Sequence, residues 1–120
     1  MKTLLLIDDS RSARMMFKHW VITARPGLQV LEAGDGLQAL EVLASLKGET
    51  VVFMDHNMPG VHGLDLARQL LEFVPANRLV MCTATIGTEI ATKVEAMGMH
   101  YLAKPINPAK LVKTLEELGL

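Results

Sequence analysis

The sequence is poor in cysteine and has almost no net charge, and each deficit argues against a class of protein. Cys82 is the only cysteine among 120 residues, so the chain cannot form an internal disulfide, which suits a reducing compartment. Its 12 basic residues nearly balance its 13 acidic residues, for a net charge of −1. Proteins that hold nucleic acid by its phosphates usually carry a basic face or a high pI. We therefore expect no direct binding of nucleic acid.

Long apolar segments and internal divisions are also missing. The run Leu4–Ile7 is too short for the core of a signal peptide, and two acids follow it at once. No stretch approaches the roughly 20 apolar residues of a membrane-spanning helix. No linker, repeat or low-complexity segment interrupts the chain. We expect one domain over residues 1–120, cytoplasmic and not associated with membranes.

The apolar residues, half of the total, form short runs that alternate with longer segments of helical period. The runs are rich in Val, Leu and Ile and show little polar alternation, which is typical of strands covered on both faces. Cys82 ends one run after Val80 and Met81, so we expect a buried thiol. The predicted strands are Thr3–Ile7, Gln29–Ala33, Val51–Met54, Leu79–Cys82 and Tyr101–Ala103.

Each segment between or after these strands has one apolar face at helical spacing. Asp35 with Gln38 resembles a capping box, and Asn107-Pro108 is an N-cap followed by Pro at the first helical position. Strict β-α alternation predicts an α/β fold, doubly wound, with a parallel sheet between two layers of helices. The predicted inward faces are Ala13, Phe17, Trp20 and Ala24; Leu40, Leu43 and Ala44; Leu64, Ala67, Leu71 and Val74; Ile90, Val94 and Met97; and Leu111, Leu115 and Leu118.

Polar residues stand where four of the five strands end. Asp8 and Asp9 follow the first strand, Asp55 the third, Thr83 the fourth and Lys104 the fifth. The carboxyl ends of parallel strands share one edge of the sheet, where ligands gather. In a 2-1-3-4-5 strand order the first and third strands are neighbours. Three carboxylates, a hydroxyl and an ammonium would then converge.

Such a cluster indicates a metal-assisted phosphoryl site. Three carboxylates together are unfavourable unless a cation neutralises them, and hard oxygen ligands favour Mg²⁺, which can still bind phosphoryl oxygens. Asp55 is then a candidate nucleophile, since aspartyl-phosphate chemistry is known. Lys104 would attract the phosphoryl oxygens, and Thr83 would donate a hydrogen bond to them. A single acid at a strand end is usually a turn former or helix cap. The prediction of a phosphoryl site therefore depends on all five polar residues standing at the same edge of the sheet.

Four ordered motifs point to one family. They are the acidic pair, "DHNMPGVHG" (residues 55–63) in the pattern D-x-x-M-P-x-x-x-G, Thr83-Ala84, and Lys104-Pro105 with an aromatic before it. Over essentially its whole length the sequence resembles the receiver domain of two-component response regulators, and is similar to single-domain chemotaxis-type regulators. The resemblance implies a flavodoxin-like three-layer sandwich with a five-stranded parallel sheet of order 2-1-3-4-5.

The resemblance also implies a role for each matching residue. Thr83 and Tyr101 would form a switch pair beside Lys104, and the Lys104-Pro105 bond is often cis in the family. Asp55 would be the phosphoacceptor, with Mg²⁺ held directly by Asp9, Asp55 and the backbone carbonyl of Asn57, and through water by Asp8. The domain would not be an enzyme beyond assisting its own phosphorylation and dephosphorylation.

The partners implied are those of a bacterial phosphorelay. The donor would be a phosphohistidine on a histidine kinase or histidine phosphotransfer protein, and the receiver of the signal a downstream output protein. We expect a monomer or a weak, phosphorylation-dependent dimer. The connection Gly98-Met99-His100-Tyr101 is one residue shorter than the usual family pattern. We therefore expect the preceding helix to sit differently.

Three alternatives stay open. The chain could be a receiver fragment of a longer regulator or hybrid histidine kinase. It could be a Mg²⁺-dependent phosphatase with an Asp nucleophile, although that class favours D-x-D and here Asp8 and Asp9 are adjacent. It could bind a nucleotide, since the segment "GDGLQA" (residues 34–39) fits a dinucleotide fingerprint. That segment follows the second strand rather than the first, however, and the sequence has no G-x-x-x-x-G-K-[ST] loop.

The remaining polar and sulfur-containing side chains have simpler explanations. His56 and His62 lack further ligands at metal spacing, so we expect solvated loop residues, with His19 on a helix surface and His100 in a loop. Along the first helix, Arg11, Arg14 and Lys18 form either a solvated face or a basic rim for the phosphodonor. A possible adaptable contact surface comprises Met15, Met16, Met97 and Met99.

Overall fold

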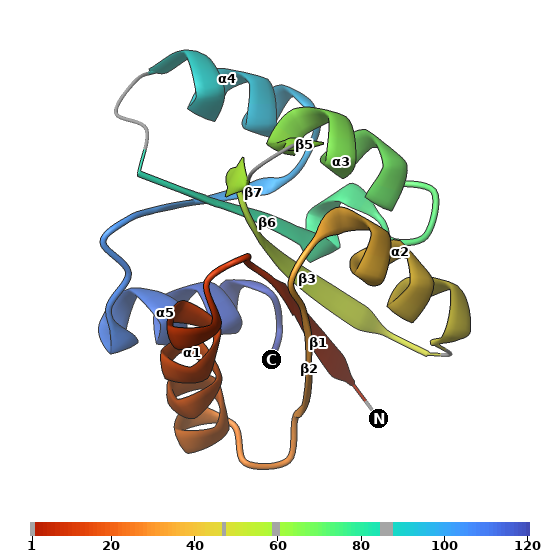
Figure 1. Cartoon of the computed structure of the whole chain (residues 1–120). Coiled ribbons are helices and arrows are strands. Elements are labelled where there is room, and N and C mark those ends of the chain that lie inside the picture. Colours follow the sequence, from red (N-terminus) through yellow and green to blue (C-terminus); the bar gives the residue numbers. More distant parts are fainter. Residues whose placement is uncertain (1, 47, 59–60, 85–87) are drawn as a thin grey trace.

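The computed structural model describes residues 2–46, 48–58, 61–84 and 88–120. Its centre is a parallel five-stranded sheet in the order β2-β1-β3-β6-β7, shown in Figure 1. Because β4 and β5 form a separate pair, this is the predicted 2-1-3-4-5 order. The sheet strands are β1 (Thr3–Ile7), β2 (Gln29–Ala33), β3 (Thr50–Asp55), β6 (Leu79–Thr83) and β7 (His100–Ala103).

Helices cover both faces of the sheet, so the predicted flavodoxin-like three-layer sandwich is confirmed. One layer holds α1 (Arg11–Ala24) and α5 (Pro108–Glu117), which pack against each other and against the sheet. The opposite layer holds α2 (Gly36–Ser45), α3 (Gly63–Leu70) and α4 (Thr88–Ala96). Among the helices that the structure describes, none is long and apolar enough to cross a membrane.

Strand β1 shows why the sheet strands lack polar alternation. All five of its residues are buried. Leu4 and Leu6 belong to the hydrophobic cluster under α1 and α5, whereas Leu5 and Ile7 belong to the cluster under α2, α3 and α4. Successive side chains enter two different cores, so the four residues from Leu4 to Ile7 are all apolar.

The predicted helix starts are confirmed by their hydrogen bonds. The Asp35 carboxylate accepts the backbone N–H of Gln38 at 2.8 Å, and the Asn107 side chain accepts that of Lys110 at 2.8 Å. Ser10 caps α1 by accepting the N–H of Ala13 at 3.3 Å. The segment "GDGLQA" is therefore explained by capping.

Two helix predictions need correction. Helix α3 ends at Leu70 rather than extending through Val74, and turns continue the chain. The helix cannot readily continue through Val74, because the residue that precedes a proline, here Pro75, disfavours the α-helical conformation. The Val74 side chain is nevertheless buried, as predicted. On α2, Ala44 is exposed, and Ala39 is buried instead. The helix approaches α3 so closely at Gly36 that a Cβ there would lie 3.0 Å from the Leu66 side chain. This close approach fixes which face of α2 is buried.

Short strands replace two predicted loops. The motif after β3 forms an antiparallel pair of β4 (Asn57–Met58) and β5 (Val61–His62), while Pro59 and Gly60 lie outside the described residues. His100 begins β7 rather than lying in a loop. Gly98, with φ +81°, follows α4 in a conformation that favours glycine. Lys104-Pro105 is cis, as the resemblance implied.

Gly63, which closes the motif, tests how tightly this hairpin folds back. A Cβ at Gly63 would lie 2.9 Å from the backbone oxygen of His56 and 3.0 Å from its Cα. Because a backbone cannot yield as a flexible side chain does, we expect Gly63→Ala to lower the free energy of unfolding in urea by about 1–3 kcal/mol. The control is Gly27→Ala, where a Cβ would meet nothing within 4 Å. Equal stability of the two variants would show that the hairpin moves aside freely.

Candidate functional site

Three carboxylates meet at the carboxyl edge of the sheet. Asp8 follows β1 and Asp55 ends β3, and these strands pair in parallel with Ile7 opposite Met54. One carboxylate oxygen from each of Asp8, Asp9 and Asp55 lies within 4.8 Å of the others. Asp55 is buried and Asp8 nearly so, whereas Asp9 is exposed. The cluster is therefore open to solvent on the side of Asp9.

Lys104 and Thr83 complete this edge. The Lys104 ammonium lies 3.0 Å from Oδ1 of Asp55, and the Lys104 N–H donates to the backbone oxygen of Thr83 at 2.9 Å. Thr83 is 1 % exposed and ends β6, one residue beyond Cys82, which pairs with Asp55. The five polar residues of the prediction therefore lie at one edge of the sheet.

The electrostatics of Asp8 are unfavourable. Burial raises the pKa of the Asp8 carboxyl, and the neighbouring Asp55 carboxylate raises it further. The backbone N–H of Ser10, 2.9 Å from Oδ1 of Asp8, acts in the opposite direction. Lys104 offsets part of the negative charge. The cluster thus holds an excess of negative charge that a cation would neutralise.

The donor set fits Mg²⁺. All its side-chain donors are carboxylate oxygens, the hard ligands that this ion prefers, and the solvent-exposed side leaves room for the waters it retains. Asn57, whose backbone carbonyl is a predicted ligand, begins β4 two residues after Asp55. The backbone of the predicted ligand therefore lies next in the chain to the cluster.

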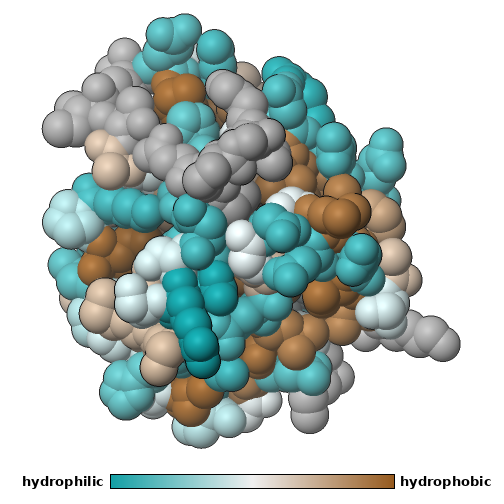
Figure 2. Space-filling view, in the orientation of Figure 1, coloured by the Kyte–Doolittle hydropathy of each residue, from teal (hydrophilic) through white to brown (hydrophobic). Residues whose placement is uncertain are grey.

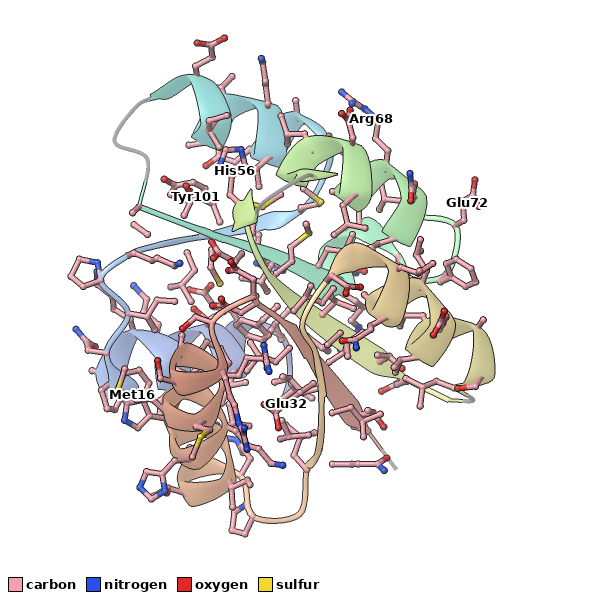
Figure 3. All side chains as sticks on the ribbon, in the orientation of Figure 1. Met16, Glu32, His56, Arg68, Glu72 and Tyr101 are labelled. Carbon is pink, nitrogen blue, oxygen red and sulfur yellow. The ribbon has the colours of Figure 1, made fainter. Side chains whose placement is uncertain are left out.

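Tyr101 lies on β7, opposite Met81 in the sheet. It is partly buried and packs against the cluster under α2, α3 and α4. Figure 3 shows Tyr101 and His56 in the same region below α4. Of the two predicted switch residues, Thr83 thus lies at the carboxyl edge of the sheet and Tyr101 packs in the layer of α2, α3 and α4.

His56 was expected in solvent, and that prediction is wrong. Both of its ring nitrogens are buried, and its backbone N–H donates to Cys82 at 2.9 Å. The reason is the close approach of His56 and Gly63 within the folded-back motif. His19 is exposed as expected, while the side chain of His62 lies outside the described residues.

Of the basic residues on α1, Arg11 is exposed, whereas Arg14 and Lys18 make contacts that a solvated face would lack. The Arg14 guanidinium donates to the backbone oxygen of Asp8, and its Nε lies 3.2 Å from the Glu32 carboxylate. Lys18 reaches the same carboxylate at 3.6 Å. The sequence singled out Arg14 only as part of a solvated face or basic rim, so its contact with the acidic pair was not predicted. The only signal is the pairing of β1 with β2, which places Leu6 opposite Glu32.

The sulfur-containing residues divide between core and surface. Cys82 is buried as predicted, and burial raises the pKa of its thiol to about 12. Met15 and Met16 are exposed on α1, but Met99 is buried in the opposite layer. The proposed four-methionine surface therefore does not exist as one patch.

In Figure 2, hydrophilic residues cover the centre of the face shown and hydrophobic residues gather over α2, where Leu37 is exposed.

Comparison with known proteins fixes the family. The family model described as "Response regulator receiver domain" matches residues 4–116. The chain belongs to the response regulator receiver family. It is 29% identical over 121 residues to the chemotaxis protein CheY of Thermotoga maritima, covering 98% of each chain. It is 33% identical to CheY1 of Helicobacter pylori, covering 94% of this chain and 93% of that protein.

Solved structures agree with this receiver fold. The chemotaxis regulator CheY4 of Vibrio cholerae matches with a TM-score of 0.81 and 31% identity over 98% of both chains. The chain also matches longer regulators, spanning 53% of NarL of Escherichia coli. The protein is therefore a receiver of two-component signalling. This family is a signalling family, so the phosphatase alternative is not supported.

Removing the acidic pair tests whether it serves a metal. Asp8→Asn keeps a side-chain oxygen that can accept the Ser10 N–H. It removes the carboxyl group whose pKa is raised by burial, and with it the negative charge. Ionised Asp8 costs stability above its raised pKa, and that cost disappears as the pH falls through it. We expect metal-free Asp8→Asn/Asp9→Asn to melt at least about 2 °C above wild type at pH 7, with a smaller difference at lower pH.

The same double variant should bind Mg²⁺ far more weakly than wild type in a calorimetric titration. Melting well below wild type in EDTA would instead identify Asp8 and Asp9 as structural caps.

Proposed function

We propose that the protein is a phosphorylation switch in which Asp55 accepts a phosphoryl group from a phosphohistidine. The donor is a histidine kinase or a histidine phosphotransfer protein. The observation that carries this proposal is the buried Asp55 carboxylate, 3.0 Å from the Lys104 ammonium and within the three-carboxylate cluster. The phosphorylated form then binds an output protein through an altered surface. Assignment to the receiver family supports this reaction.

In the transfer, an Asp55 oxygen forms a bond to phosphorus while the bond from phosphorus to the donor imidazole breaks. The imidazole leaves with the electron pair and is protonated by solvent. Lys104 would pass from its ion pair with Asp55 to the phosphoryl oxygens, which keeps its positive charge beside the negative charge of the group transferred. Positioning and charge neutralisation supply the catalysis.

Asp55 is the better acceptor among the three acids. Oδ1 of Asp8 already accepts the Ser10 N–H, and Asp9 is exposed. Asp55 lies on a separate strand, between the acidic pair and β6. Mg²⁺ would be held directly by Asp9, Asp55 and the carbonyl of Asn57, and through water by Asp8. When bound, it would neutralise the carboxylates and the incoming phosphoryl oxygens.

We propose one receiver domain over residues 1–120, working in the cytoplasm as a monomer or as a weak phosphorylation-dependent dimer. The near-complete coverage of the Thermotoga maritima and Helicobacter pylori chemotaxis proteins favours a receiver acting alone. The match to 29% of the regulator RpfG of Xanthomonas campestris is the observation that favours the second candidate, a receiver joined to further domains.

Phosphorylation should require Asp55. Incubation with acetyl phosphate and Mg²⁺ should add the mass of one phosphoryl group to the wild-type chain, detected by intact-mass spectrometry. Asp55→Asn preserves the shape of the side chain but replaces the nucleophilic carboxylate by an amide. We expect no added mass for this variant, and none for wild type in EDTA. Uptake by Asp55→Asn at the wild-type rate would refute the assignment.

Thr83 should couple the phosphoryl group to Tyr101. A hydrogen bond from the Thr83 hydroxyl to a charged oxygen is worth about 1–2 kcal/mol, enough to shift a two-state population about tenfold. We expect Thr83→Ala to be phosphorylated still, but to lose most of the NMR shift changes around Tyr101 on addition of beryllofluoride.

Thr83→Ser retains the hydroxyl and should retain most of this response, which makes it the matched control. An unchanged perturbation at Tyr101 in Thr83→Ala would show that the two residues are independent.

A further inference from the structure

We infer that Arg14 is a positioning residue for the Mg²⁺ site, acting through the peptide unit that joins Asp8 to Asp9. This inference rests on the proposed function, because it concerns the same carboxylates. Arg14 lies in the first half of α1, and its side chain is 16% exposed. It touches the backbone of the acidic pair rather than the carboxylate oxygens.

Asp8 is held from three directions. Its N–H donates to the oxygen of Ala33 at 3.1 Å, and its carboxylate Oδ1 accepts the Ser10 N–H at 2.9 Å. Its backbone oxygen accepts the Arg14 guanidinium. The first two contacts fix the end of β1 and the side chain. The third orients the carbonyl of the Asp8–Asp9 peptide unit, and with it the direction in which Asp9 leaves the strand.

Arg14 also closes the loop that carries Asp9. Its backbone N–H donates to Ser10 at 3.0 Å, as part of the first turn of α1. Its side chain returns to Asp8, two residues earlier than Ser10. Asp9 therefore lies between two residues that are both bonded to Arg14. Without these two hydrogen bonds, an exposed aspartate could sample several positions. Because Arg14 already restrains the loop, less conformational entropy is lost when Asp9 binds a metal ion.

Glu32 holds the guanidinium in place from β2. The Nε of Arg14 lies 3.2 Å from one oxygen of Glu32, and Lys18 reaches the other at 3.6 Å. Figure 3 shows Glu32 between β2 and α1. The two guanidinium donors point to different strands, one to the backbone after β1 and one to β2. A lysine ammonium has no planar fork with which to span the two acceptors.

Charge and position predict opposite results, which makes the inference testable. A positive charge beside a cation site repels the cation, so removing it should by Coulomb's law tighten Mg²⁺ binding. If Arg14 acts by position, removing it should weaken binding. Arg14→Met removes both the charge and the contacts, and Arg14→Lys removes only the fork. Lys18→Met is the matched control, since Lys18 also pairs with Glu32 from α1.

The experiment is a Mg²⁺ titration of the full chain, followed by calorimetry and by the fluorescence of Trp20, the only tryptophan. We expect the dissociation constant to rise about tenfold in Arg14→Lys and in Arg14→Met. In Lys18→Met we expect a change within about twofold. A dissociation constant that is unchanged or lower in Arg14→Met would overturn the inference.

Three further measurements separate the possible failures. At saturating Mg²⁺, Arg14→Lys should be phosphorylated by acetyl phosphate at nearly the wild-type maximal rate; a maximal rate that stays low would contradict a role in metal positioning. If either Arg14 variant unfolds in EDTA, Glu32→Gln is measured instead, because it weakens the contact that holds the guanidinium and leaves Arg14 itself in place. An unchanged Mg²⁺ dissociation constant in Glu32→Gln would count against the inference. Failure of wild type to bind Mg²⁺ would refute the proposed site itself.

Discussion

Repulsion among three carboxylates is the constraint around which this site is built. Asp8, Asp9 and Asp55 place oxygens within 4.8 Å of one another, with two of the acids largely removed from water. Such an arrangement costs folding free energy unless positive charge is nearby. Lys104 supplies one charge at 3.0 Å from Asp55. The remaining excess of negative charge is what a divalent cation would neutralise in the proposed phosphorylation.

The fold tolerates this cost because the surrounding sheet is strongly stabilised. β1 and β3 lie in the middle of the sheet, with hydrophobic side chains entering separate cores on its two faces. Their register brings the ends of both strands to the same level. The carboxylates can therefore be held close together by backbone hydrogen bonds that do not depend on the charges themselves.

The site joins the layers that a switch must connect. Asp55 and Thr83 end neighbouring strands, whereas Tyr101 packs in the layer of α4. A change in the position of the Thr83 hydroxyl would be felt one strand away, at Tyr101. The ring nitrogens of His56 are buried, and the close approach of His56 to Gly63 brings the end of β3 against the start of α3. The short connection after Gly98 leads from α4 into the same layer, since Met99 is buried there. That this connection changes the position of α4 is a prediction specific to this chain.

The sequence by itself determined the α/β alternation, the bounds of β1 and β2, the helix caps and the polar residues of the carboxyl edge. These features depend on local patterns: a strand covered on both faces needs an unbroken apolar run, and parallel strands bring all their carboxyl ends to one edge. Only the tertiary structure decided the contact of Arg14 with Asp8 and Glu32, the burial of His56 and the exposure of Ala44. Each of these depends on how closely backbones distant in the chain approach, at Gly63, at Gly36 and between β1 and β2, and no local pattern encodes that distance.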